Sequence, residues 1–210
     1  MVWNRRRTCD DAAVASALEL RPGLRAQRAG IAVAHDQRSA QLADTVLSHR
    51  AISRLEPGDW VTCYSSYRDE PPTRELLRRL CAKGLAVLVP AVHGENLHWH
   101  DVTGEVDDPA AWTRDSYGIP RPRTPEVATT AHELLALGVR VIITPGLGME
   151  RSGARIGQGG GFYDRFFAQW PRYADGGPFR LGITHFGGIL VDGTIDLLPH
   201  DEPIDDALEG

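Results

Sequence analysis

Cysteine is scarce in this sequence. The chain has three cysteines among 210 residues, Cys9, Cys63 and Cys81, and no two of them form a CxxC pair. An odd number without paired spacing argues against the disulfide framework of small secreted proteins and against a zinc ribbon. A reducing compartment fits this composition best, so we expect the protein in the cytoplasm.

Long apolar segments are also missing. No apolar run is long enough to cross a bilayer. Arginines at 5–7 are followed by Asp10 and Asp11 instead of the apolar core of a signal peptide. We therefore expect a protein that is neither exported nor bound in a membrane.

The sequence has no excess of positive charge. It contains 23 basic and 28 acidic residues, for a net charge of −5. This balance argues against a general binder of nucleic acid or anionic membranes. An anionic ligand must therefore find a local positive site, and the expected partner is a small molecule.

Apolar periodicity predicts alternating helices and strands. Two helical patterns occupy 24–55 and separate near His35, and Pro22 suits the first turn of the earlier helix. Further helices are expected at about 73–84, 130–137 and 161–170. Strands are expected at 59–64, 85–89, 139–144 and 180–184.

These elements predict an α/β fold. The order strand, helix, strand within 59–89 forms a βαβ unit, which builds a parallel sheet. Residues 97–102 alternate like a half-exposed strand and 107–125 is proline-rich, so this region is expected to be an irregular excursion at the sheet edge.

With 42% hydrophobic residues, 1–210 can form one domain. We predict a three-layer α/β/α sandwich with a mostly parallel sheet and an edge hairpin excursion. Ligands are expected at the carboxyl ends of the strands. Residues 1–20 are expected to be a flexible extension, and the domain is expected to act as a monomer.

The most informative segment is a glycine-rich loop within 144–165. Such glycine density is typical of backbone that approaches a ligand closely or adopts positive φ. The loop runs into a predicted helix, so backbone N–H groups would face an anion, with Arg151, Arg155 and Arg165 nearby. The alternative is a mobile surface loop, but these features favour a phosphate site.

Two commoner phosphate motifs do not match this loop. A P-loop needs Lys and then Ser or Thr after its last glycine, whereas Phe162 and Tyr163 follow Gly161. A dinucleotide fingerprint starting at Gly157 would need a glycine at 162, and it would directly follow a strand. The loop therefore belongs to another class of phosphate site.

The segments Pro145-Gly146-Leu147-Gly148 and Arg155-Ile156-Gly157-Gln158-Gly159-Gly160-Gly161-Phe162-Tyr163-Asp164-Arg165 closely resemble the signature of 5-formyltetrahydrofolate cyclo-ligases. Outside this signature, 24–28 resembles the first helix of the family and 69–73 its substrate segment. Later landmarks are Tyr117-Gly118-Ile119-Pro120 and Pro199-His200-Asp201. The resemblance covers all but about the first twenty residues.

The resemblance implies an Mg-ATP-dependent enzyme that converts 5-formyltetrahydrofolate to 5,10-methenyltetrahydrofolate. In the family, ATP phosphorylates the formyl oxygen, N10 attacks the activated carbon, and phosphate leaves. Such chemistry mainly requires positioning and charge neutralisation. By this resemblance, Arg155 and Tyr163 are catalytic, Ser65 and Glu70 face the folate, and Asp164 and Asp201 serve Mg²⁺. ATP is expected to contact Arg21, Arg25, Arg155, Ile156, Gly157, Gln158, Gly159, Gly160, Gly161, Phe162 and Tyr163.

Some positions depart from the family pattern. Arg21 stands where Lys is usual, Glu150 where Asp is usual, and a Gln common near Gly188 is missing. A non-catalytic nucleotide- or folate-binding relative is therefore an alternative, and a sugar-phosphate isomerase of similar architecture is another. Asp164 could also serve only the helix dipole, and Asp201 could be one solvated charge of an acidic tail at 201–209.

Overall fold

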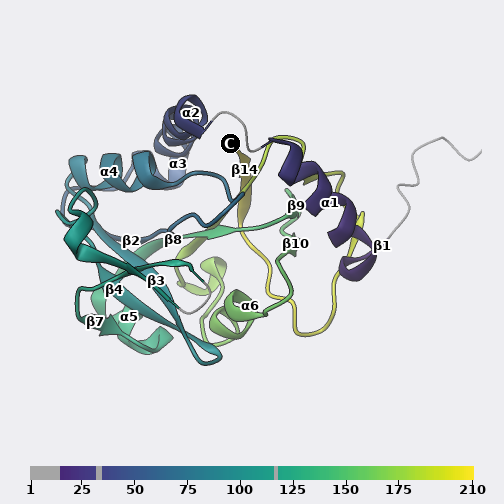
Figure 1. Ribbon diagram of the computed structural model, residues 1–210. Helices are drawn as coiled ribbons and strands as arrows, with labels where there is room; N and C mark the ends of the chain where they lie inside the picture. Colours follow the sequence, from purple (N-terminus) through teal and green to yellow (C-terminus); the bar gives the residue numbers. More distant parts are fainter. Residues whose placement is uncertain (1–14, 32–34, 116–117) are drawn as a thin grey trace, which may run out of the picture.

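The computed structural model describes residues 15–31, 35–115 and 118–210 (Figure 1). Its centre is a seven-stranded sheet with the order β14-β11-β8-β2-β3-β4-β7. The neighbouring strands from β14 to β3 run parallel, whereas β4 and β7 are antiparallel additions at one edge. The strands are β2 (Trp60–Thr62), β3 (Ala86–His93), β4 (Asn96–Asp101), β7 (Glu126–Ala128), β8 (Val139–Pro145), β11 (Phe179–Thr184) and β14 (Asp206–Glu209).

Helices cover both faces of this sheet (Figure 1). One face carries α2 (His35–Ser48), α3 (Arg50–Ser53) and α4 (Arg74–Ala82), and the other carries α5 (Ala131–Leu137) and α6 (Phe162–Phe167). The expected mixed α/β fold with a mainly parallel sheet is confirmed.

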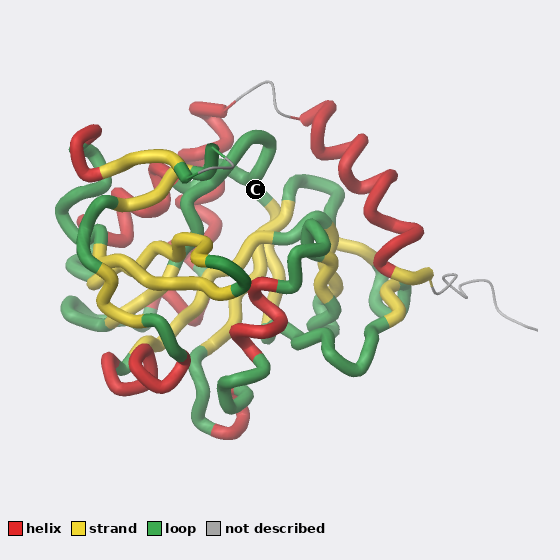
Figure 2. The backbone as a smooth tube through the Cα atoms, turned by 60° about the horizontal axis from the view of Figure 1, so that its bottom comes forward, coloured by secondary structure: helices red, strands yellow, loops and turns green. Residues whose placement is uncertain are grey.

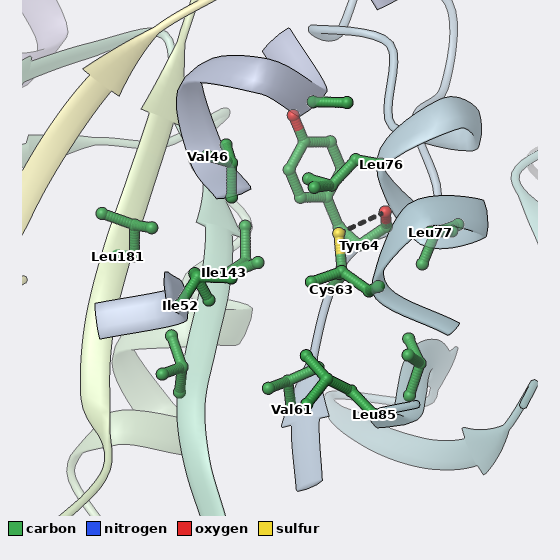
Figure 3. Packing of buried hydrophobic residues seen from close by; sticks show 14 of the residues in the cluster. Val46, Ile52, Val61, Cys63, Tyr64, Leu76, Leu77, Leu85, Ile143 and Leu181 are labelled. Atoms are coloured by element: carbon green, nitrogen blue, oxygen red, sulfur yellow. Dashed lines mark hydrogen bonds between the residues drawn. The ribbon is translucent and has the colours of Figure 1, made fainter. Parts of the chain in front are cut away.

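Two apolar clusters follow from the alternation of side chains along the strands. Val141 and Ile143 of β8 belong to the cluster under α2–α4, whereas Ile142 between them belongs to the cluster under α5 and α6. Figure 3 shows part of the first cluster, where the labelled side chains are Val46, Ile52, Val61, Cys63, Tyr64, Leu76, Leu77, Leu85, Ile143 and Leu181.

A third, smaller cluster lies beside the main sheet, where α1 (Ala17–Ile31) runs along short strands (Figure 2). These strands are β1 (Ala15–Ser16), β9 (Gly148–Glu150), β10 (Arg155–Ile156), β12 (Ile189–Leu190) and β13 (Ile195–Asp196). Leu24 is the buried apolar residue that α1 contributes to this cluster. The helix is therefore anchored on the small strands and not on the main clusters.

The first described residues are more ordered than a flexible extension would be. Residues 15–20, which fall within the expected extension, form β1 and the first turn of α1. The Ser16 amide and hydroxyl donate hydrogen bonds to Glu19 at 2.8 and 2.7 Å, as in a capping box. Because the helix begins at Ala17, Pro22 lies inside it and not in its first turn.

Two regions in which no strand was expected contain strands. Within 107–125, β5 (Trp112–Arg114) and β6 (Pro120–Pro122) form an antiparallel hairpin preceded by a 3-10 turn at Pro109–Ala111. The expected acidic tail contains β14, which pairs with β11. Its acids are used as acceptors: Asp206 pairs with Arg151 and His49, and Glu209 accepts backbone bonds from Gly187 and Ile189.

Further differences concern β4 and α6. β4 is not half exposed, because β7 and α6 cover it, and Leu97, Trp99 and His100 are buried. The helix expected at 161–170 ends at Phe167. Across the described residues, no helix has the length and apolarity needed to cross a membrane.

Candidate active site

Two arginines of α1 contact the glycine loop. Arg21 Nε donates to the Gly157 carbonyl at 3.1 Å. Arg25 donates from Nη2 to the Gln158 carbonyl at 2.9 Å and from Nε to its side-chain oxygen at 3.1 Å. A guanidinium carries five N–H donors, so both side chains retain donors for an anion. The structure thus brings these four predicted residues together.

The part of the glycine loop at 157–161 has backbone that favours glycine at two positions. Gly159 has φ +101° and Gly161 has φ +65°, where residues with a Cβ are strained. A Cβ at Gly161 would also lie 2.7 Å from Arg165 Nη1. Since α6 has only six residues, its dipole is weak. The positive charge of the loop therefore comes mainly from arginines.

Arg155 and Tyr163 lie at the inner side of this loop. The Arg155 side chain is 4% exposed, and its Nη2 donates to Asp164 Oδ1 at 2.6 Å. Its guanidinium carbon lies 5.8 Å from the centre of the Tyr163 ring. Burial, and then the nearby Glu70 carboxylate, raise the pKa of Tyr163 well above its usual value. Tyr163 therefore stays protonated and can act as a donor but not as a base.

The carboxylates expected to serve Mg²⁺ lie near one stretch of backbone. Asp164 Oδ1 is 3.5 Å from the amide of Glu202, the residue after Asp201, and Asp201 Oδ2 accepts from the Leu198 amide at 2.8 Å. No group of three or more potential metal ligands occurs among the described residues. Mg²⁺ at phosphate sites commonly uses one or two carboxylates with waters and phosphates. An Mg²⁺ ion held by these residues would therefore take further ligands from water and from a nucleotide.

The segment after β2, which is expected to face the folate, folds back on itself. Thr73 Oγ1 donates to the Tyr64 carbonyl at 2.7 Å and accepts from the Ser66 amide at 3.0 Å. Tyr64 is buried, and its hydroxyl donates to the Pro71 carbonyl. Tyr64 is therefore a core residue, and its ring is not available to stack on a ligand.

Glu70 lies in a poorly solvated position on this segment. Its side chain is 18% exposed, and Oε2 accepts from the Tyr67 amide at 3.0 Å. Burial raises the pKa of Glu70 to about 7, although Arg28 and the Tyr67 amide oppose the shift. The carboxylate can thus exchange a proton near neutral pH.

Arg28 and His185 were not expected at the site. Arg28 is buried, and its Nε donates to the Asp69 carbonyl at 2.6 Å and lies 3.2 Å from Asp69 Oδ2. His185 Nε2 contacts the same carbonyl, and burial lowers the pKa of its imidazole. The helical spacing of Arg28 from Arg21 and Arg25 places all three on one face, which is the signal that could have identified it.

A cavity of about 430 Å³ opens beside this segment. Ser65 lines it, whereas Glu70 does not, so the two expected folate residues occupy different surroundings. Residues of the β5–β6 hairpin and of α4 both line it. Sequence reasoning missed this hairpin because 107–125 lacks a periodic pattern. The lining residues are Ser65, Ser66, Thr73, Arg74, Leu77, Val106, Pro109, Trp112, Thr113, Arg114 and Pro120.

Glu150, one departure from the family pattern, is a buried acceptor. It accepts hydrogen bonds from Ser152 Oγ at 2.7 Å and from the backbone amides of Gly193 at 2.9 Å and Ile195 at 2.5 Å. These bonds tie β9 to the turn before β13. The substitution therefore affects the small cluster under α1.

Known proteins resemble this chain in sequence. The family model described as the 5-formyltetrahydrofolate cyclo-ligase family matches residues 13–210. The 5-formyltetrahydrofolate cyclo-ligase of Mus musculus is 23% identical over 173 residues, 82% of each chain. The one of Mycolicibacterium smegmatis is 31% identical over 154 residues, 70% of this chain and 72% of the relative.

Solved structures resemble this chain in fold. A 5,10-methenyltetrahydrofolate synthetase from Aquifex aeolicus has a TM-score of 0.63 at 19% identity, covering 91% of this chain and 88% of that chain. One from Mycoplasma pneumoniae has a TM-score of 0.59 at 16% identity, covering 91% and 96%. At these identities the structures show a shared fold, and the family match extends over nearly the whole sequence. The chain therefore belongs to the 5-formyltetrahydrofolate cyclo-ligase family.

Proposed function

We propose that the protein cyclises 5-formyltetrahydrofolate to 5,10-methenyltetrahydrofolate, using ATP and Mg²⁺ and passing through a phosphorylated formyl group. The observation that carries this proposal is the contact of Arg21 and Arg25 with the glycine loop at Gly157 and Gln158. This contact places two positively charged side chains against a loop whose backbone conformation favours glycine. We also place the reaction in the cytoplasm and take the chain to act as a monomer.

The residues of the loop would hold the nucleotide. ATP, when bound, supplies the phosphoryl group that activates the formyl oxygen. Backbone N–H groups of 156–163 and the guanidinium groups of Arg21, Arg25 and Arg155 would neutralise the phosphates. Asp164 and Asp201 would hold Mg²⁺. Tyr163 keeps its proton and would donate a hydrogen bond to an oxygen of the reacting group.

The folate would lie on the side of the segment after β2. A Glu70 carboxylate accepts hydrogen bonds, which suits the N–H groups of a reduced pteridine. The cavity beside Ser65 offers the apolar face of Trp112 and the charges of Arg74 and Arg114. This combination suits an aromatic ligand that carries carboxylates.

A turnover assay tests the proposal directly. The purified protein should form a product that absorbs in the near ultraviolet when 5-formyltetrahydrofolate, ATP and Mg²⁺ are all present. Omitting ATP or chelating Mg²⁺ should each stop its formation. Tight nucleotide binding without product would instead support the non-catalytic relative, for which Arg21 in place of the usual Lys is the motivating difference.

A further inference from the structure

Helix α1 contacts three loops through successive side chains. Arg21 and Arg25 bind the glycine loop, Gln27 Nε2 donates to the Gly187 carbonyl at 3.2 Å, and Arg28 binds Asp69. These loops follow β10, β11 and β2. One helix therefore joins the expected nucleotide side to the expected folate side.

Arg28 makes the contact on the folate side. Its Nε reaches both the carbonyl and the carboxylate of Asp69, and its Nη2 lies 4.0 Å from Glu70 Oε1. The side chain is only 4% exposed. A buried charge stays in place when it is paired and hydrogen-bonded, so Arg28 fixes this segment to the helix.

The charges around Glu70 come from several elements. Arg28 of α1 opposes its protonation, and Asp69 on its own segment favours it. Glu70 in turn acts on Tyr64, which follows β2, and on Tyr163 of α6. Arg28 is thus the positive member of this group, and it is also the one carried by α1.

Because α1 is anchored beside the glycine loop, a movement of that loop can be transmitted along the helix to Arg28. Leu24 and Arg28 are the buried residues of this helix. Leu24 packs in the small third cluster with Leu147 and Ile156, which precede the glycines at 157–161. A ligand that orders the glycine loop therefore acts on the element that also carries Arg28.

We propose that Arg28 is a positioning residue: it ties the Asp69–Glu70 segment to α1, so that nucleotide binding at the glycine loop and folate binding beside Glu70 strengthen each other. The inference rests on the proposed function. Such coupling is reciprocal between the two ligands, and typical values are about 5–150-fold in affinity.

The test measures this coupling by calorimetry. 5-Formyltetrahydrofolate is titrated with and without a saturating non-hydrolysable ATP analogue and Mg²⁺, using wild type, Arg28→Met and Arg28→Lys. In wild type the analogue should lower the folate Kd about fivefold or more. In Arg28→Met this tightening should fall below about twofold, while affinity for the analogue alone stays near wild type. Arg28→Lys should be intermediate, since an ammonium lacks the planar fork.

Arg180 offers a matched control. It is also buried, and it donates to backbone carbonyls including Phe167 and Pro203 near the start of β11, away from α1. Arg180→Met should lower stability but keep the full coupling. A coupling loss of equal size in Arg180→Met, or full coupling in Arg28→Met, would overturn the inference.

Hydrogen exchange supplies a readout that needs only the nucleotide. Adding the analogue with Mg²⁺ to wild type should slow exchange in 66–73 as well as in 155–163, and Arg28→Lys should reduce the effect in 66–73 alone. Protection of 155–163 without any change in 66–73 in wild type would overturn the inference, even if Arg28→Met failed to fold. Wild type that binds both ligands without coupling contradicts this inference only, whereas wild type that binds neither contradicts the proposed function as well.

Discussion

Arg155 Nη2 lies 2.6 Å from Asp164 Oδ1, so two residues expected to contact opposite charges, phosphate and Mg²⁺, are themselves an ion pair. The pair sits where β10 and the glycine loop meet α6, with Arg155 almost fully buried. Burying a paired charge costs much less than burying a single one. The pair therefore explains how a buried arginine is held at the site.

The first prediction concerns Asp164. Asp164→Asn keeps an oxygen for Arg155 but removes the negative charge, so Mg-dependent turnover should be lost in a folded protein. Asp164→Ala should also lower the free energy of unfolding by about 1–3 kcal/mol, because Arg155 is left without its acceptor. Turnover against Mg²⁺ concentration and urea denaturation measure the two effects. Normal turnover in Asp164→Asn would exclude a metal role.

The second prediction separates the folate from the nucleotide. Removing a charged hydrogen-bond partner costs about 1.5–3 kcal/mol, so Glu70→Gln should weaken 5-formyltetrahydrofolate binding roughly tenfold or more. Affinity for ATP alone should remain near wild type. Calorimetric titration of each ligand measures both. An equal loss for ATP, or no loss for the folate, would contradict the assignment of Glu70.

The third prediction follows from the titration of Glu70. Its pKa is raised from 4.5 to about 7, so the folded protein holds this proton more tightly than the unfolded chain. The resulting stability is fully present below about pH 4.5 and is lost as pH rises towards 7. At about 1.36 kcal/mol per pKa unit, the whole loss is roughly 3 kcal/mol.

Glu70→Gln removes this titration. The variant should therefore unfold at higher urea concentration than wild type at pH 8, and the advantage should shrink at pH 5. Asp44→Asn is a suitable control, because Asp44 is 72% exposed and lies on α2. A Glu70→Gln protein no more stable than wild type at pH 8 would show that the carboxylate is not destabilised by burial.

Local signals predicted the central part of the fold. Four strands of the parallel sheet, β2, β3, β8 and β11, and the helix α4 follow from apolar periodicity, and the glycine loop follows from composition. α5 begins at a capping box in which Thr130 Oγ1 accepts from the Glu133 amide at 3.2 Å and Glu133 binds back to the Thr130 amide at 3.0 Å. The sequence signals that predict such elements lie within a few neighbouring residues.

The missed elements depend on distant partners. The sequence of β14 resembles an acidic tail because two of its four residues are acids. Their partners, Arg151, His49 and backbone amides, are distant in sequence and come close only in the folded chain. Arg28 likewise looks like one more arginine of a surface helix until the segment at Asp69 covers it. The spacing of Arg28 places it on one helix face with Arg21 and Arg25, but nothing in the local sequence shows that long-range contacts bury it.

The last prediction concerns Arg25, whose role can be separated from folding. Its side chain is exposed and makes its two bonds to Gln158. Exposed contacts of this kind contribute about 0–1 kcal/mol to stability, so Arg25→Met should unfold close to wild type. A nucleotide phosphate would lose a charged donor, and ATP affinity should fall by roughly tenfold. Arg140→Met is the matched control, since Arg140 is 65% exposed and lies 3.8 Å from Asp59 near the amino end of the sheet. Calorimetry at low and high salt completes the test, because the difference between Arg25→Met and wild type should narrow as screening increases. Unchanged ATP affinity in Arg25→Met, or an equal loss in Arg140→Met, would show that the contact between α1 and the glycine loop serves the fold and not the nucleotide.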